Sequence, residues 1–162
     1  MAVAKKTPRH GLDELDVAIL SELQCDASLA QAELARRLSL SGPAVHQRVK
    51  RLERQGYVKR IVALLDRELL GQDLMCFVHV AMQAHHRDRL GIFRETAQRL
   101  PEVLECHHLT GEYDFLLKVL APDRPSLERL LVEKLSTIPG VGRLQTSVVL
   151  SEVKHTTAIP LD

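Results

Sequence analysis

Apolar residues recur at helical spacing in two short segments that only three or four residues separate, one over about 30–38 and one from about 42 to 55. Ser41 is a suitable N-cap for the second segment, and Pro43 is tolerated in its first turn, where its missing N–H costs nothing. Two helices joined by so short a turn are typical of a helix-turn-helix. The apolar stripes are Ala32, Leu34, Ala35 and Leu38, then Val45, Val49 and Leu52.

A further amphipathic helix precedes this pair and begins near residue 12. Acidic residues stand near its start, where the helix dipole favours negative charge. The helix after it is less well marked, because Ala30 at its start cannot accept a hydrogen bond as a polar N-cap would. An unrelated three-helix module therefore stays open beside the helix-turn-helix. The stripe of the first helix is Leu12, Leu15, Ile19 and Leu23.

The net charge of +1 conceals a local excess of positive charge. Residues 27–60 contain eight Lys or Arg and two Glu, a balance of +6, whereas the rest of the chain carries −5. A basic segment on a nearly neutral chain is the electrostatic footprint of a face that binds a polyanion. Because a solvated helix face gives the same count, the charge supports DNA binding only together with the helical pattern.

Helical geometry turns the polar side chains of the third helix away from its apolar stripe. The amide of Gln47 can form hydrogen bonds with the edge of a base. Lysine and arginine side chains suit phosphates, and arginine can also form two hydrogen bonds with guanine. Arg48 lies closer to the stripe, which favours a role within the helix or on a phosphate. For His46, a solvated side chain without a DNA contact is the simpler interpretation. The candidate DNA-binding residues are Ser41, Pro43, His46, Gln47, Arg48, Lys50, Arg51 and Arg54.

The second half of the chain alternates between strand and helix patterns. Residues 57–65 lose the helical period and suggest an extended segment that leaves the helical domain. The order strand, helix, strand, strand, helix, strand then predicts a ferredoxin-like α+β domain. Its strands are expected at 74–82, 103–109, 115–120 and 143–153, and its helices at 90–100 and 127–135. The helices of one chain can cover only one face of the sheet. We therefore expect Phe77, Val148 and Leu150 to lie on the other face, where a second copy of the chain would cover them.

Several motifs resemble those of the Lrp/AsnC (feast/famine) regulators, over nearly the whole chain. In the first half the resemblance rests on the third helix and its exit. In the second half it rests on residues 111–114 and 138–141, and residues 152–157 resemble the leucine-responsive branch in particular. The matching residues of the first half are Ser41, Val45, Arg48, Val49, Leu52, Glu53, Gly56 and Tyr57, followed by Ala63, Leu64, Leu65 and Asp66.

The resemblance implies a winged or strand-extended helix-turn-helix joined to a ligand-binding domain that forms dimers and then rings, often octamers. It also implies an amino acid or related metabolite as effector, held between neighbouring dimers, and transcriptional regulation through double-stranded DNA. We therefore expect residues 1–11 to be a flexible N-terminus, 12–60 a helix-turn-helix DNA-binding domain, 61–72 an extended linker, and 73–162 a ferredoxin-like domain for effector binding and oligomerisation.

The same resemblance assigns residues 111–114 as the effector loop. Gly111 permits a tight turn, and Asp114 offers a carboxylate to an ammonium group; without the resemblance, an ordinary hairpin turn would explain them equally well. Family positions linked to the effector response fall on His107, Arg124, Ser136, Val148 and Val149. The first three are more polar than in the leucine-responsive proteins, so either the effector differs from leucine or these residues line an interface. The candidate effector-binding residues are Gly111, Glu112, Tyr113, Asp114, Ser136, Val148 and Val149.

Cysteine and histidine pairs invite a metal interpretation, since both residue types are good zinc ligands. Neighbours on a strand point to opposite faces, however, so His107 and His108 cannot share one ion, and Cys106 would group only with His108. The pairs Cys76 with His79 and His85 with His86 add no clearer pattern. Neither a metal nor a cofactor is therefore expected, and the odd number of widely spaced cysteines indicates free thiols.

Catalytic motifs are lacking, because the sequence contains no phosphate-binding glycine loop and no nucleophile elbow. Siroheme decarboxylases resemble this family in both domains and use histidines near the C-terminal sheet, so the eight histidines keep an enzyme alternative open. The cationic third helix speaks against it. No apolar run of membrane-spanning length and no signal peptide is visible, which makes the cytoplasm the expected location.

Overall fold

The computed structural model describes residues 11–83 and 87–161. Contacts between Cα atoms divide the chain into two compact units. One unit runs up to Leu64 and takes in the residues from Lys154 onward, and the other is Leu65–Val153. The expected flexible segment 1–11 lies outside the described residues except for Gly11. No helix within the described residues is both long enough and apolar enough to cross a membrane.

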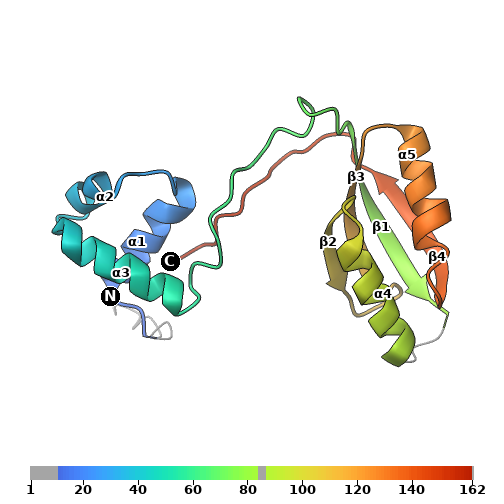
Figure 1. Cartoon of the computed structure of the whole chain (residues 1–162), viewed down its shortest axis with the longest axis horizontal. Helices are drawn as coiled ribbons and strands as arrows, with labels where there is room; N and C mark the ends of the chain where they lie inside the picture. The colour runs from blue at the N-terminus through green and yellow to red at the C-terminus, as the bar shows by residue number, and fades with distance from the viewer. Residues whose placement is uncertain (1–10, 84–86, 162) are drawn as a thin grey trace, which may run out of the picture. The chain divides into compact units, whose positions relative to one another are not determined.

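The first unit consists of three helices, α1 (Glu14–Cys25), α2 (Gln31–Arg37) and α3 (Gly42–Arg54) (Figure 1). The Ser41 hydroxyl caps α3 by accepting a hydrogen bond from the backbone N–H of Ala44 at 3.4 Å. Ala30 caps α2 without any side-chain hydrogen bond, as its residue type predicts. Gly56 follows α3 with a φ of 80°, the left-handed conformation that ends helices.

Most residues of the expected apolar stripes form or border the core of this unit. Packing of α2 and α1 against α3 buries their central residues, which confirms the three-helix prediction. Ala32 is an exception, because it lies on the exposed side of α2. The turn between α2 and α3 places Ser39 at a φ of 53°, an uncommon conformation for a residue with a Cβ atom. The buried residues of the cluster are Ile19, Leu34, Ala35, Val45, Val49 and Leu52.

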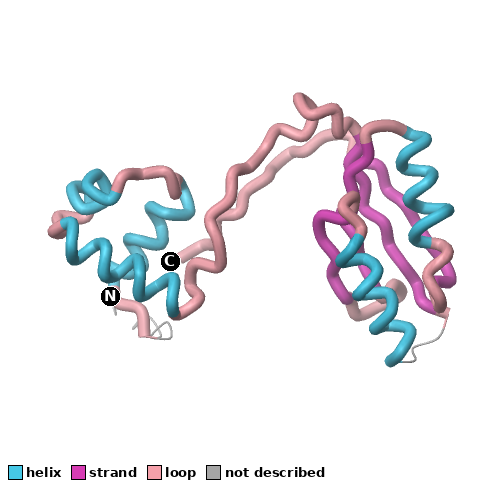
Figure 2. The backbone as a smooth tube through the Cα atoms, in the orientation of Figure 1, coloured by secondary structure: helices cyan, strands magenta, loops and turns pink. Residues whose placement is uncertain are grey.

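Residues on either side of the second unit run without helix or paired strand (Figure 2). The expected extended segment 57–65 therefore forms no strand within the described residues. The C-terminal residues group with the helices, because the Gln24 amide of α1 bonds the backbone of Ile159 in both directions, at 2.9 and 3.0 Å. Sequence patterns alone had assigned these last residues to the second domain.

The second unit is a four-stranded antiparallel sheet with helices. Its elements are β1 (Leu74–Met82), α4 (Arg87–Arg99), β2 (Val103–His108), β3 (Phe115–Ala121), α5 (Arg124–Arg129), its π-helical continuation η1 (Leu130–Leu135), and β4 (Val141–Val148). The strand order β2-β3-β1-β4 places β3 between β1 and β2, the split βαβ arrangement of the ferredoxin-like fold. The fold prediction for this half is therefore confirmed.

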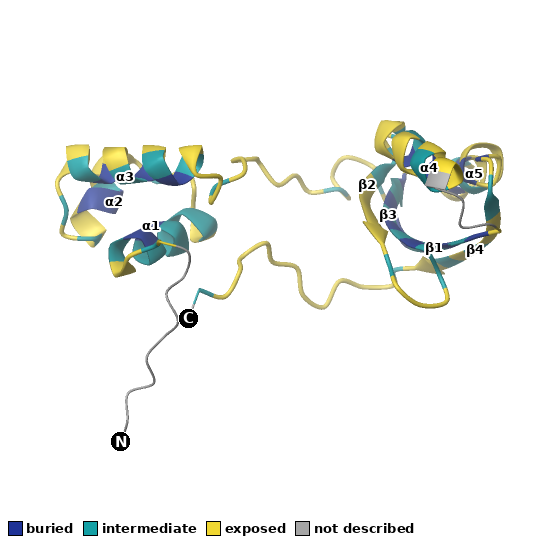
Figure 3. Cartoon of the chain, turned by 90° about the horizontal axis from the view of Figure 1, so that it is seen from below, coloured by how far each residue is buried: buried dark blue, intermediate teal, exposed yellow. Residues whose placement is uncertain are grey.

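All helices of this unit cover the same face of the sheet (Figure 3). Side chains alternate along β3, and along β1 from Cys76 onward, so the even-numbered residues of β1 from Cys76 to Met82 and the odd-numbered residues of β3 are buried beneath the helices. Phe93 of α4 packs on Phe115 of β3, with ring centroids 4.4 Å apart. The opposite face, called the open face below, carries half-buried residues such as Phe77 and Leu116.

One expectation about the open face is wrong. Val148 pairs with Cys76, which is buried under the helices, so Val148 belongs to the helix-covered face although it is 49% exposed. Leu150 lies beyond β4, because the strand ends at Val148 and not near residue 153. Only Phe77 lies on the open face as expected, opposite Ser147. The alternating pattern of residues 143–153 predicts a longer strand than backbone pairing supports.

Candidate nucleic-acid interface and effector loop

The exposed side of α3 presents polar and cationic side chains along one surface. These side chains line a shared shallow hollow, whereas Val45, Val49 and Leu52 face the core. Pro43 and Ser41 stand at the N-terminal end of the same helix and are exposed. The outward direction deduced from helical geometry is therefore correct. The residues of the hollow are Ala44, His46, Gln47, Arg48, Lys50, Arg51 and Arg54.

Two of these arginines are held by α1. The Arg48 guanidinium donates to Asp13 at 2.7 Å and to Asp16 at 2.8 Å, and the Arg51 guanidinium donates to the other oxygen of Asp16. The Asp16 side chain is only 1% exposed, so its charge is buried between two cations. Arg48 and Arg51 therefore link α3 to α1 through ion pairs, and they also lie on the cationic surface.

The remaining polar side chains of the surface are more available. Lys50 pairs with Glu53 at 2.8 Å, an exposed contact of the kind that contributes little to stability. His46 shares a hydrogen bond of 3.0 Å with Gln31 of α2. Within the described part of the chain, Gln47 is exposed and makes no hydrogen bond through its side chain. Gln47 can therefore present both its donor and its acceptor to a base edge.

The ion pairs between the helices also affect titration. The hydrogen bond from Arg48 holds the pKa of Asp13 below its ordinary value of 3.8, and the backbone N–H of Asp16 acts in the same direction. A carboxyl with a depressed pKa in the folded state stabilises the fold above its ordinary pKa. That contribution is lost as the pH falls through the lowered value, so acid weakens the link between α1 and α3.

The predicted effector loop, residues 111–114 and called the effector loop below, is anchored to β4. The Tyr113 hydroxyl donates to Gln145, and Arg143 pairs with Glu112. The Arg143 guanidinium also lies over the Tyr113 ring, 4.8 Å from its centroid. Gly111 has a φ of 126°, a conformation that only glycine adopts readily. Contacts with β4 therefore hold this turn in place, which distinguishes it from a freely solvated hairpin turn.

Asp114 is tied to the adjoining strand. One of its carboxylate oxygens accepts a hydrogen bond from the backbone N–H of Met82 at 2.7 Å. Its own backbone N–H donates to the carbonyl of Val80 at 2.9 Å, and its carbonyl accepts from Leu109 at 2.8 Å. These bonds place Asp114 at the end of the sheet where β1 finishes.

The other candidate effector residues divide between the two ends of the sheet. Val148 pairs with Cys76, and the backbone of Val149 bonds Met75, near the start of β1. The effector loop lies at the far end of β1, about 20 Å away at the rise of a strand. Ser136 follows η1, and its hydroxyl donates to the carbonyl of Val132 at 2.6 Å. One small ligand cannot contact both the loop and the valines of the same copy.

The histidines and cysteines considered as metal ligands are dispersed. Cys106 and His108 lie on the helix-covered face of β2, and His107 lies on the open face, where its ring contacts Glu105 at 3.0 Å. The pair His85 and His86 lies outside the described residues. Among the residues that are described, no three His, Cys, Asp or Glu side chains gather closely enough to hold a metal ion.

Comparison with known proteins agrees with this architecture. Residues 12–59 match a model of winged helix-turn-helix DNA-binding domains, and residues 75–159 match a model of the Lrp/AsnC ligand binding domain. The leucine-responsive regulatory protein of Escherichia coli K12 is 39% identical over 155 residues, which cover 96% of this chain and 94% of that protein. The chain belongs to the Lrp/AsnC family of transcriptional regulators.

Other Lrp/AsnC relatives support the assignment. The leucine-responsive regulatory protein of Klebsiella pneumoniae is also 39% identical, over 96% of this chain and 94% of its own length. A transcriptional regulator from Neisseria meningitidis, solved as an L-Met complex, has a TM-score of 0.90 at 36% identity and covers 93% of this chain and 97% of its own. These relatives are regulators and not enzymes, which excludes the siroheme decarboxylase alternative.

A structure of E. coli AsnC extends the same comparison to a more distant relative. Its TM-score is 0.84 at 28% identity, and it covers 92% of this chain and 99% of its own. The winged helix-turn-helix and the antiparallel α+β domain predicted from the sequence are thus the architecture of this Lrp/AsnC protein.

Sequence reasoning missed the acidic partners of α3. Asp13 and Asp16 form a capping box at the start of α1, with bonds of 2.8 and 3.2 Å between each side chain and the other residue's backbone N–H. Acidic residues three apart before an apolar run are the signature of such a cap. Their second role as partners of Arg48 and Arg51 has no sequence signal, because the partners lie more than 30 positions away.

Replacing Asp16 by alanine should destabilise the helical unit. Arg48 and Arg51 would lose a buried acceptor, and the loss of a charged hydrogen bond costs about 1–3 kcal/mol. Thermal unfolding followed by circular dichroism measures the change, and Glu14→Ala, an exposed acidic residue in the same first turn, is the matched control. Equal stability of the two variants would show that the ion pairs between α1 and α3 contribute nothing.

Proposed function

We propose that this Lrp/AsnC regulator reads double-stranded DNA with α3 and changes its binding when an amino acid occupies a site that two copies form together. The observation that carries the DNA part is the exposed row of Gln47, Lys50 and Arg54 on a helix whose other side is buried. Because the proposed partner is chromosomal DNA, we expect the protein to act in the cytoplasm.

The polar residues of α3 divide by chemistry. Lys50 and Arg54 are exposed cations suited to phosphates, and Gln47 can form two hydrogen bonds with one base. Arg48 and Arg51 serve first to hold the helix on α1, with N–H groups left over for phosphate oxygens. Ser41 and Pro43 bring the helix N-terminus to the surface, where backbone N–H groups favour an anion, and His46 stands beside them.

Replacing Gln47, Lys50 and Arg54 together by alanine should abolish specific binding to a duplex selected in vitro with the unaltered protein. The slope of log affinity against log salt concentration should also become shallower by about two, since two phosphate contacts are lost. Fluorescence anisotropy over a range of salt concentrations measures both quantities. Arg99→Ala with Arg129→Ala, which removes two exposed cations from the other unit, should leave affinity and slope unchanged.

The proposal of an amino-acid effector rests on the contacts of the effector loop and on the distance between this loop and the two candidate valines. Asp114 supplies a carboxylate for an ammonium group, and the turn around Gly111, Glu112 and Tyr113 is held in place by β4. Ser136, Val148 and Val149 would come to this ligand from a neighbouring copy or lie at the contact between copies. A related regulator from Neisseria meningitidis has been solved with L-Met, which supports an amino acid as the ligand here.

Asp114→Asn should weaken effector binding about tenfold or more, because the amide keeps an acceptor for the N–H of Met82 but loses the charge that attracts ammonium. The amino acid is first identified by a thermal-shift screen of all twenty, since a ligand of the folded state raises Tm. Glu128→Gln, an exposed change on α5, is the control. A screen in which no amino acid raises Tm would remove the basis for this sensing role.

Exposed apolar side chains support a homodimer as the basic unit. The segment that leaves the helices exposes Ile61, Val62, Leu64 and Leu65 to between 58% and 74%, without any strand partner. The open face of the sheet adds Phe77 and Leu116. Apolar surfaces of this extent on a monomer mark a site of association. Dimers that assemble further, as far as an octamer, would bring the two parts of the effector site together.

Size-exclusion chromatography with light scattering should give a mass of at least twice 18.2 kDa without DNA. Phe77→Glu should shift the protein toward the monomer, because the charge would be buried between two open faces. The matched control is Ile92→Glu, which changes a 43% exposed residue on the outer side of α4. A monomer at micromolar concentration before any substitution would contradict the proposed assembly.

A further inference from the structure

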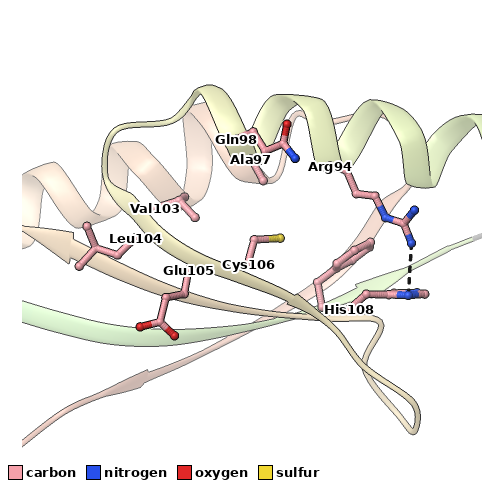
Figure 4. A pocket seen from close by; sticks show the side chains of 9 residues that line it. Arg94, Ala97, Gln98, Val103, Leu104, Glu105, Cys106 and His108 are labelled. Carbon is pink, nitrogen blue, oxygen red and sulfur yellow. Dashed lines mark hydrogen bonds between the residues drawn. The ribbon is translucent and has the colours of Figure 1, made fainter. Parts of the chain in front are cut away.

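A groove in the second unit lies between α4 and β2, and none of its lining residues belongs to the effector loop. Its volume is about 400 Å³, within the range of small-ligand sites. Arg94, Ala97 and Gln98 of α4 form one wall, and residues of β2 form the other (Figure 4). The residues that β2 and β3 contribute are Val103, Leu104, Glu105, Cys106, His108 and Phe115.

The polar end of the groove is cationic. The Arg94 guanidinium donates to Nδ1 of His108 at 3.2 Å, and among the described residues no carboxylate lies within ion-pair distance of Arg94. A guanidinium has five N–H groups, so the bond to His108 leaves a pair available for a bidentate partner. Arg94 is therefore an exposed cation at a concave site without an acidic partner.

Glu105 is the only carboxylate among the described residues that line the groove, and its side chain is directed elsewhere. The register of β2 shifts between Val103 and Glu105, which turns Glu105 to the open face opposite Lys118. There its oxygens contact His107 at 3.0 Å and Lys118 at 3.5 Å, and the hydrogen bond from His107 is the main reason that the pKa of Glu105 is lowered. Figure 4 shows Glu105 pointing away from Arg94 and Cys106.

The rest of the groove is apolar or weakly polar. Ala97 and Phe115 are buried, and together with the half-buried Val103 they give the groove an apolar lining, called its floor below. The thiol of Cys106 is a neutral group at neutral pH, because burial raises its pKa. An anionic head beside Arg94 could therefore extend an aliphatic tail along this floor.

We propose that the groove binds a small carboxylate that has an aliphatic tail and lacks an amino group. The carboxylate pairs with Arg94 and the tail covers Ala97, Val103 and Phe115. An amino acid would place its ammonium beside Arg94, and in the described part of the chain no carboxylate is directed into the groove to compensate that charge. The site thus selects against the class of ligand proposed for the effector loop, and the protein would sense an amino acid and a deaminated acid at separate places.

The test uses the full-length protein with Cys25→Ser, so that Cys106 is the exposed thiol and Cys76 stays buried. The probe is 4-methylpentanoate, with L-leucine as its amino-bearing counterpart and 4-methylpentanamide as the uncharged one. Calorimetry measures binding, and the rate of Cys106 alkylation measures occupancy of the groove. We expect 4-methylpentanoate to bind and to slow alkylation, and the other two compounds to leave the rate unchanged.

Arg94→Gln should weaken binding of 4-methylpentanoate about tenfold or more, because it removes the charged partner of the carboxylate. Arg99→Gln, on the same helix, should bind as the parent does, and neither change should alter unfolding because both side chains are exposed. Binding that survives Arg94→Gln, equal protection by L-leucine, or no protection at all would overturn the proposal. A Cys106 that fails to react before any probe is added would also overturn it, since a second copy would then cover the groove.

Discussion

The burial of Asp16 between Arg48 and Arg51 is the interaction on which the DNA-reading surface depends. Apolar contacts of Val45, Val49 and Leu52 hold α3 in the three-helix core. The buried carboxylate of Asp16 adds a directional link between α1 and α3, because it accepts hydrogen bonds from two arginines one turn apart. The cost of burying that charge is offset only when both arginines stay in place. The cationic face is thus presented in one orientation.

The second unit shows how one sheet separates different tasks. Alternation along β3, and along β1 from Cys76 onward, commits one face of the sheet to the helices and leaves the other face without a helix of this unit. The effector loop lies at one end of β1, and Val148 lies at the other. The proposed effector, which depends on both, would lie between copies, so its binding and the proposed assembly of the protein would be thermodynamically linked.

Local shifts in register decide which side chains meet. The irregularity in β2 after Val103 turns Glu105 toward Lys118 and leaves Arg94 as the dominant charge of its groove. Bulges of this kind redirect side chains without changing the fold. The effector loop illustrates the same principle, because Tyr113 and Glu112 are held by residues of β4 that lie about 30 positions further along.

The sequence by itself determined the three helices, the Ser41 cap, the outward face of α3 and the βαββαβ order, because helical and strand periods and local caps act over a few residues. The pattern misjudged the length of β4 and the face of Val148, since alternation along a segment does not reveal where backbone pairing stops. Only the tertiary structure decided the partners of Arg48 and Arg51, the anchoring of residues 111–114, and the return of Ile159 to Gln24. These contacts join residues that are distant in the chain, and such pairs leave no periodic signal.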